Sequence, residues 1–241
     1  MEKLAFGAEP APRLYRLRLA RYFYHTQVLN EKLADGGNLI LDAGCGRGRA
    51  PLYWKASGRP ETETRFVGFD ICPVRLEFAK KRGYAQLIQS TISERWPFRD
   101  ESFDAVICEQ VLEHLTDEQV SFALSEMHRV LKPGGFVLVG TPIFTRFTLL
   151  FAPLWTRLNP LLRRLKGKDT EASHLQHYSI AGINKILRHH NFEPESVRGF
   201  RLFTLPKQLL EDDLWFYELQ QWFGKKVPAL CGEVTTVARK K

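Results

Sequence analysis

Few cysteines, no long apolar run and no leader-like segment are the first features of this 241-residue sequence. Its four cysteines are scattered and form no metal-ligand or redox pair, which predicts reduced thiols in a reducing compartment. It has no run of about 18 apolar residues, so no membrane-spanning helix is expected. Residues 1–12 lack the apolar core of a signal peptide. These absences predict a cytoplasmic protein.

The composition is that of a globular protein with a basic surface. Hydrophobic residues make up 44% and charged residues 26%, and the length fits one large domain or a domain with an insertion. The formal net charge of +8 predicts attraction to polyanions, either nucleic acid or an anionic membrane face. Basic residues gather in residues 13–21 and 157–168, and a plain solvated basic surface is the alternative interpretation.

A glycine-rich turn follows the first apolar run, Leu39–Leu41. It reads Asp-Ala-Gly-Cys-Gly-Arg-Gly-Arg-Ala from Asp42 to Ala50. Glycines permit positive φ and let a ligand lie against bare backbone. Pro51 then stands in the first turn of the next helix, where its missing N–H costs nothing. This pattern predicts a buried strand, a ligand-binding turn and a helix, the arrangement in which nucleotide-like cofactors bind.

Short apolar runs alternate with helical patterns along the first part of the chain. We expect strands at residues 38–42, 65–70, 85–90, 103–108 and 136–140, and helices at 14–34, 73–82 and 117–131, with a turn at 132–135. This alternation predicts a parallel, doubly wound α/β sheet. Farther on we expect a helix at 179–190, strands at 196–203 and 233–238, and an amphipathic stretch at 209–223.

The pattern also divides the chain into four segments. Residues 1–37 are expected to form an N-terminal helical cap and residues 38–142 the cofactor-binding core. Residues 143–178, here called the lid, are rich in aromatic residues and arginine and are interrupted by prolines. Such a stretch is too long for a simple connection, so we interpret it as an insertion for the acceptor. Residues 179–241 would complete the same domain.

Asp70 closes the second expected strand, at the edge of the sheet where the glycine turn lies. A carboxylate has four acceptor sites and suits the two neighbouring hydroxyls of a ribose. Asp70 is therefore a candidate ribose ligand. The alternative interpretation is an acid that caps the next helix.

Four motifs in order make the pattern specific: LDAGCGRG, GFD, WPFRDESFDAVICEQVLEHL and RVLKPGGFVLVGTP. Together they resemble the class I S-adenosylmethionine-dependent methyltransferases, especially the subgroup that modifies small molecules, quinone precursors and lipids. The resemblance covers residues 38–142. The tail GEVTTVARKK resembles the last, antiparallel strand of that family. The implied fold is a doubly wound Rossmann-like α/β sheet, mostly parallel with an antiparallel last strand, plus a helical lid.

The resemblance implies S-adenosylmethionine as cofactor. The expected binding residues are Asp42, Gly44, Cys45, Gly46, Asp70, Ile71, Ile92, Glu109 and Gln110. The glycine turn would line the methionine end, Asp70 would hold the ribose and Ile71 would pack against the adenine. Glu109 and Gln110 would face the methionine or the acceptor. Many relatives read the adenine amino group with an acid near the end of the third strand, but residues 90–93 contain none.

Some relatives bind a divalent cation through a Glu-x-x-Glu-His motif after the fourth strand. Here Glu113 and His114 match its last two positions, but Gln110 replaces the first glutamate. An amide removes negative charge that Mg²⁺ favours, so no metal is predicted. A site made of Glu113, His114 and His174 is the alternative.

Methyl transfer needs mainly alignment of the acceptor with the activated methyl group, and a hydroxyl acceptor also needs a base. Histidine suits that task near neutral pH. His177 is the first candidate base, His174 the second and His114 the third. The alternative is that Ser179 caps a helix and the histidines only bond locally.

We therefore expect methyl transfer to a small-molecule or lipid-like acceptor, at oxygen rather than carbon. In relatives, a helix such as the N-terminal one, with Tyr22, Phe23, Tyr24 and His25, covers the cofactor pocket. The aromatic and basic lid predicts peripheral contact with an anionic membrane. Alternatives are an RNA methyltransferase and a catalytically silent binding protein. A dehydrogenase is disfavoured because the turn lacks G-x-G-x-x-G.

Overall fold

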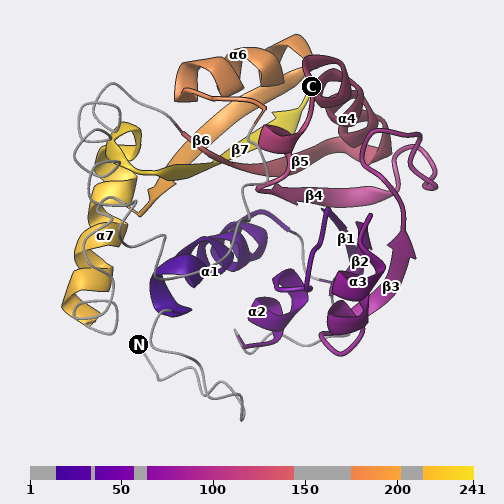
Figure 1. The fold of residues 1–241 in the computed structure, drawn as a ribbon, viewed down its shortest axis with the longest axis horizontal. Helices are drawn as coiled ribbons and strands as arrows, with labels where there is room; N and C mark the ends of the chain where they lie inside the picture. Colours follow the sequence, from indigo (N-terminus) through magenta and orange to yellow (C-terminus); the bar gives the residue numbers. More distant parts are fainter. Residues whose placement is uncertain (1–14, 34–35, 57–63, 144–174, 202–213) are drawn as a thin grey trace, which may run out of the picture.

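The computed structural model describes residues 15–33, 36–56, 64–143, 175–201 and 214–241, and Figure 1 shows them as one sheet between two layers of helices. The strands are β1 (Asn38–Ala43), β2 (Thr64–Asp70), β3 (Tyr84–Gln89), β4 (Phe103–Glu109), β5 (Leu131–Pro142), β6 (Phe192–Phe200) and β7 (Glu233–Lys240). Their order across the sheet is β3-β2-β1-β4-β5-β7-β6. Neighbours from β3 to β5 are parallel, and β7 is antiparallel to both β5 and β6. The predicted doubly wound, mostly parallel α/β sheet is confirmed.

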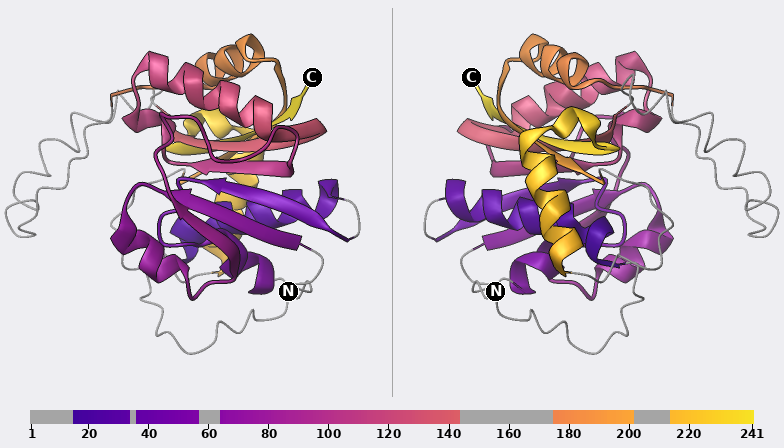
Figure 2. Two further views of the ribbon diagram at one scale, coloured as in Figure 1. Left: turned by 90° about the vertical axis from the view of Figure 1, so that its right-hand side faces the viewer. Right: turned by 90° about the vertical axis from the view of Figure 1, so that its left-hand side faces the viewer.

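Helices cover both faces of this sheet. They are α1 (Tyr15–Lys32), α2 (Ala50–Ala56), α3 (Pro73–Ala79), α4 (Asp117–Val130), α6 (Ile180–His189) and α7 (Leu214–Lys226), with short 3₁₀ turns η1 (Leu112–His114) and η2 (Pro228–Leu230). Figure 2 shows α4 and α6 on one face and α1, α2 and α7 on the other. No helix in the described ranges is long and apolar enough to cross a membrane.

The strands bury side chains on both faces because both are covered. Ile40 packs with Val28 and Leu29 of α1, whereas its neighbour Leu41 packs into the cluster beneath α4 and α6. Successive side chains of a strand point to opposite faces, so one apolar run feeds two cores. Burying each of these aliphatic side chains contributes about 1.5–3 kcal/mol. The N-terminal helix is thus anchored on the sheet.

Several boundaries differ from the sequence-based expectation, among them that of β6, which is Phe192–Phe200 rather than 196–203. Helix α3 ends at Ala79 rather than Arg82, because the chain enters a tight turn that leads to Gly83 at φ 93°. The expected turn at residues 132–135 lies inside β5. There Gly134 adopts φ 75°, and the pairing with β4 shifts register between Phe103 and Ala105.

A capping box fixes the start of α4, shortly after the chain leaves β4. Thr116 accepts a hydrogen bond from the backbone N–H of Gln119, and the Gln119 side chain accepts one from the Thr116 N–H. This capping box begins α4 directly after η1 and satisfies amides that the helix itself leaves free. The turn between β4 and α4 therefore has a defined path.

The lid begins and ends at the same place in the fold. Ile143, after β5, forms a parallel bridge with Tyr178, before α6. Residues 144–174 lie outside the described residues, and with them Pro153, Pro160, His174 and most of the lid. The two ends of the lid meet beside the carboxyl end of β5.

Candidate functional site

The glycine turn after β1 is held by backbone geometry that glycine allows. Gly44, Gly46 and Gly48 have φ values of 74°, 54° and 77°. The amides of Gly44 and Cys45 both donate to the Phe69 carbonyl oxygen at 2.9 Å, which ties the turn to β2. A Cβ built on Gly46 would meet nothing within 4 Å. At Gly46 the turn therefore borders open space with bare backbone, as a ligand-binding turn must, whereas a Cβ on Gly44 would come 2.6 Å from Val111 and one on Gly48 2.7 Å from Tyr84.

Asp70, at the end of β2, joins this turn to the start of α3. Its carboxylate accepts the Gly46 amide at 2.8 Å and the Cys72 amide at 2.9 Å. The residue is 5% exposed. The amide of Cys72, the residue that precedes α3, thus bonds to Asp70, but this amide lies outside the helix, so the bond is not a cap of α3. A carboxylate has acceptor sites beyond these two, so the ribose role stays a prediction.

Asp42 lies buried beneath the turn. Its Oδ2 accepts a hydrogen bond from the Tyr84 hydroxyl at 2.5 Å. Burial raises the pKa of Asp42 to about 7, against the lowering effect of the Tyr84 bond, and the charges of Glu109 and Asp70 raise it further. A positively charged ligand beside this carboxyl group would favour its ionised form.

The two isoleucines predicted to bind cofactor lie in different surroundings. Ile71 is 67% exposed just before α3, so an apolar side chain is open to a flat ligand beside the turn. Ile92 is buried in the core beneath α4, where its carbonyl oxygen accepts the Trp96 indole N–H. Cys45 is also buried, and burial raises the pKa of its thiol, which makes it an unreactive part of the turn.

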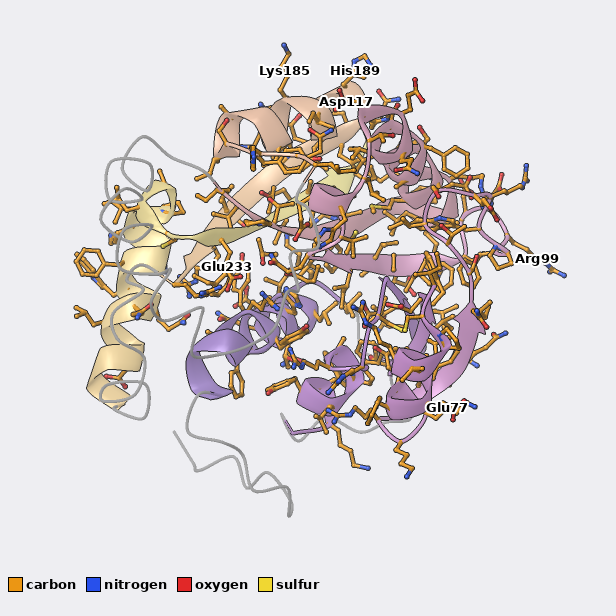
Figure 3. All side chains as sticks on the ribbon, viewed as in Figure 1. Glu77, Arg99, Asp117, Lys185, His189 and Glu233 are labelled. Carbon is orange, nitrogen blue, oxygen red and sulfur yellow. The ribbon has the colours of Figure 1, made fainter. Side chains whose placement is uncertain are left out.

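Glu109, at the end of β4, is the centre of a buried polar cluster. It accepts hydrogen bonds from His25 Nε2 at 2.6 Å and Thr235 Oγ1 at 2.9 Å. Arg21 Nε lies 3.8 Å from Glu109 Oε2, and Arg21 Nη1 donates to Glu233 Oε2 at 3.0 Å. In Figure 3, Glu233 lies between α1 and the start of β7, whereas His189 projects from the outer side of α6. Helix α1, β4 and β7 therefore meet at one charged site.

Sequence reasoning missed Arg21 as a site residue and treated His25 only as part of a covering helix. The two are four positions apart on α1 and so share a helical face, and that spacing is the signal that could have selected them. Neither has a sequence motif that points to Glu109, because the contact is made by folding.

Gln110 has a left-handed backbone. Its φ is 57°, uncommon for a residue other than glycine, and its amide donates to the Gly140 carbonyl oxygen at 2.8 Å. Its side-chain Nε2 is buried with no hydrogen-bond partner among the described residues. Such strained residues gather at functional sites, which agrees with its predicted place beside the ligand.

Two of the three predicted bases, His177 and His114, are exposed. The side chain of His114 is 38% exposed, with Nε2 4.0 Å from Glu113 Oε1. The carbonyl oxygen of Glu113 accepts hydrogen bonds from the amides of Leu175 and Gln176. The segment that leads to His177 therefore lies against η1. His174 lies outside the described residues.

Glu113 itself is 1% exposed, and burial raises its pKa to about 7. Its Oε2 has no hydrogen-bond partner in the described part of the chain. Within that part, no three His, Cys, Asp or Glu side chains converge as a metal site. Glu113 is therefore a buried acid beside the end of β4.

Comparison with known proteins gives a consistent picture. The family described as "Methyltransferase domain" matches residues 41–139. A probable S-adenosylmethionine-dependent methyltransferase of Mycolicibacterium smegmatis is 31% identical over 182 residues, which cover 74% of this chain and 62% of that protein. A probable tRNA methyltransferase 9B of Homo sapiens is 38% identical over 104 residues, or 43% of this chain. The chain spans only 21% of the length of that human protein.

The same fold occurs in solved structures. A Thermotoga maritima protein described as a SAM-dependent methyltransferase, possible histamine N-methyltransferase, superposes with a TM-score of 0.63 at 19% identity. The match covers 95% of this chain and 91% of that one. At this identity the likeness shows the fold alone.

Proposed function

We propose that this chain transfers a methyl group from S-adenosylmethionine to a small-molecule or lipid-like acceptor, at oxygen. Residues 41–139 match the family described as a methyltransferase domain, and the chain shares its fold with S-adenosylmethionine-dependent methyltransferases. The observation that supports the proposal most is the glycine turn at the carboxyl edge of the sheet, where the Gly46 amide donates to Asp70 and a Cβ on Gly46 would meet nothing within 4 Å. The strand order reverses between β1 and β4, and ligands of such sheets bind at that point.

S-adenosylmethionine is the cofactor of this domain, and the described residues fit it. The open backbone at Gly46 gives the room that a ligand against the turn needs. The exposed Ile71 side chain offers an apolar contact for the adenine ring of the cofactor. The buried Asp42, with its pKa raised to about 7, suits the positive charge of the cofactor. When bound, the cofactor supplies an activated methyl group, and these residues hold and orient it.

An oxygen acceptor agrees with the acid–base character of the site. A hydroxyl must lose its proton as it is methylated, so a proton acceptor is needed close by. His25, Glu109 and Glu113 bring such groups to the end of β4. The acceptor would lie over β4 and β5, beside the cofactor over β1 and β2.

RNA is the second candidate acceptor. The net charge of +8 and the likeness to a probable tRNA methyltransferase favour it. Its binding would weaken steeply with salt, since phosphate contacts release counterions. Contact of the lid with anionic membranes stays a proposal that rests on the sequence, because residues 144–174 lie outside the described ranges.

The test is transfer of a labelled methyl group from S-adenosylmethionine to four probes: a simple phenol, a free fatty acid, anionic phospholipid vesicles and bulk tRNA. The proposal expects label on the phenol, the fatty acid or the lipid. Label on tRNA alone would replace it with the RNA assignment. Cofactor binding without transfer to any probe would favour a silent binding protein.

A further inference from the structure

The pair formed by His25 and Glu109 has the geometry of an oriented base. His25 is 2% exposed, and its Nε2 lies 2.6 Å from Glu109 Oε1. An ionised carboxylate only accepts hydrogen bonds, so the ring nitrogen that faces it carries the proton. In a neutral imidazole the other nitrogen, Nδ1, then keeps its lone pair. His25 Nδ1 is buried and has no hydrogen-bond partner among the described residues.

The carboxylate that orients His25 is itself fixed. Thr235 Oγ1 donates to the same Glu109 oxygen at 2.9 Å. Gly140 leaves room for it, since a Cβ there would come 1.9 Å from Glu109 Oε2. The charged groups around the pair are Arg21 on α1, Glu233 on β7, Asp42 on β1 and Glu113 on η1. A base held by a second group in this way is the general pattern of activated sites.

His25 Nδ1 is one of several unpartnered polar atoms on α1 and at the ends of β4 and β5. They include His25 Nδ1, Glu109 Oε2, Gln110 Nε2, Glu113 Oε2 and Thr141 Oγ1, all buried and without hydrogen-bond partners in the described ranges. Apart from His25, all follow or end β4 and β5. A buried polar atom that is left unpaired destabilises the fold. A ligand with a hydroxyl group would satisfy part of this set, and Nδ1 is the member that can take a proton.

The surroundings of His25 are aromatic. The Tyr22 ring meets the His25 ring edge-on at 5.5 Å between centroids. Tyr22 also stacks on Tyr53 at 5.4 Å, and Phe23 meets the same Tyr53 ring at 5.1 Å. Aromatic rings pack well against such a wall. The neighbourhood therefore favours an acceptor whose hydroxyl is carried by an aromatic ring.

We propose that His25, oriented by Glu109, is the general base for a phenolic acceptor, an assignment that rests on the proposed methyltransferase function. His25 Nδ1 takes the hydroxyl proton as the phenol oxygen forms a bond to the methyl carbon. The carbon–sulfur bond breaks, and its electron pair returns to sulfur. Glu109 stabilises the imidazolium that results. The exposed His114 and His177 are not needed for this step.

The first readout needs neither cofactor nor acceptor. Nitrogen-15 NMR of the imidazole at neutral pH should show His25 neutral, protonated at Nε2 and bare at Nδ1. Glu109→Gln should weaken this preference, because an amide can present either a donor or an acceptor. A His25 protonated at Nδ1, or at both nitrogens, would overturn the assignment.

The second readout compares two phenols at about pH 8: 4-methoxyphenol, whose hydroxyl is protonated like that of tyrosine, and 4-nitrophenol, which is largely ionised. His25→Gln, which can still donate to Glu109, should lower kcat for 4-methoxyphenol by about 10²–10⁴-fold and change 4-nitrophenol turnover little. His189→Gln on the outer side of α6 is the control and should match wild type.

Calorimetric titration with S-adenosylmethionine distinguishes failure of the His25 assignment from failure of the methyltransferase assignment. Equal losses for both phenols in His25→Gln, with cofactor affinity kept, would show a structural role only. Wild type that binds cofactor but methylates neither phenol would overturn the phenolic acceptor and leave the methyltransferase assignment intact. Wild type that fails to bind cofactor would overturn both.

Discussion

Gly140 on β5 lies directly against the Glu109 carboxylate on β4: a Cβ built on Gly140 would come 1.9 Å from Glu109 Oε2 and 2.2 Å from its carboxyl carbon. No side chain fits there while Glu109 keeps its contacts. The absence of one atom in β5 thus permits the cluster that joins α1 to the sheet.

Gly140→Ala should therefore displace Glu109 and release its bonds to His25 and Thr235. Overpacking of this kind costs about 1–3 kcal/mol in the free energy of unfolding. Thermal denaturation would give the loss, and hydrogen exchange should show faster opening of α1 than of α4. Gly182→Ala on α6, where the nearest atom is Ser179 Oγ at 3.2 Å, is the matched control and should have little effect. Unchanged exchange in α1 would contradict this role.

Comparison of Gly46→Ala with Gly36→Ala distinguishes the effect of backbone strain from the effect on ligand binding. Both glycines have positive φ, 54° and 85°, and a Cβ at either would meet nothing within 4 Å. Each substitution should cost about 1–2 kcal/mol of stability, because an L-residue is strained there. Only Gly46→Ala should also weaken S-adenosylmethionine binding, by at least about tenfold, since its new methyl group enters the ligand space. Calorimetry measures both affinities, and an equal loss in the two variants would contradict the site.

The raised pKa of Asp42 should make both the stability of the fold and the binding of cofactor depend on pH. Its folded pKa of about 7 lies above the ordinary value of 3.8. A raised pKa means that the folded state holds the proton more tightly, so this contribution to stability is present below about pH 4 and is lost as the pH rises to about 7. Asp42→Asn should remove that part of the dependence in denaturation curves measured across this range.

Binding of the cationic cofactor should show the opposite trend. It favours the ionised carboxylate, so affinity should rise with pH up to about 7, by at most about tenfold per unit for a single group. Asp42→Asn should flatten this profile. Glu113→Gln is the comparison. The pKa of Glu113 is also raised to about 7, but this residue lies outside the glycine turn. A wild-type profile without slope would contradict the electrostatic role of Asp42.

The core of the fold could be predicted from local patterns. Strands β1 to β5 and the helices between them follow from apolar runs and helical spacing, and the glycine turn and Asp70 follow from their places at strand ends. The contact between His25 and Glu109 could not be predicted, because it joins residues 84 positions apart through a helix and a strand that do not pair. His177 was favoured for its motif, and the structure shows that this residue is exposed.

The central claim is that the glycine turn and Asp70 bind S-adenosylmethionine. The most direct measurement is calorimetric titration of wild type and Asp70→Ala with S-adenosylmethionine, with NAD as the comparison ligand and thermal denaturation as the check on folding. We expect wild type to bind S-adenosylmethionine and not NAD, and Asp70→Ala to lose at least about tenfold in affinity, or 1.4 kcal/mol. Equal affinity in a folded Asp70→Ala protein, or preference of wild type for NAD, would contradict the account.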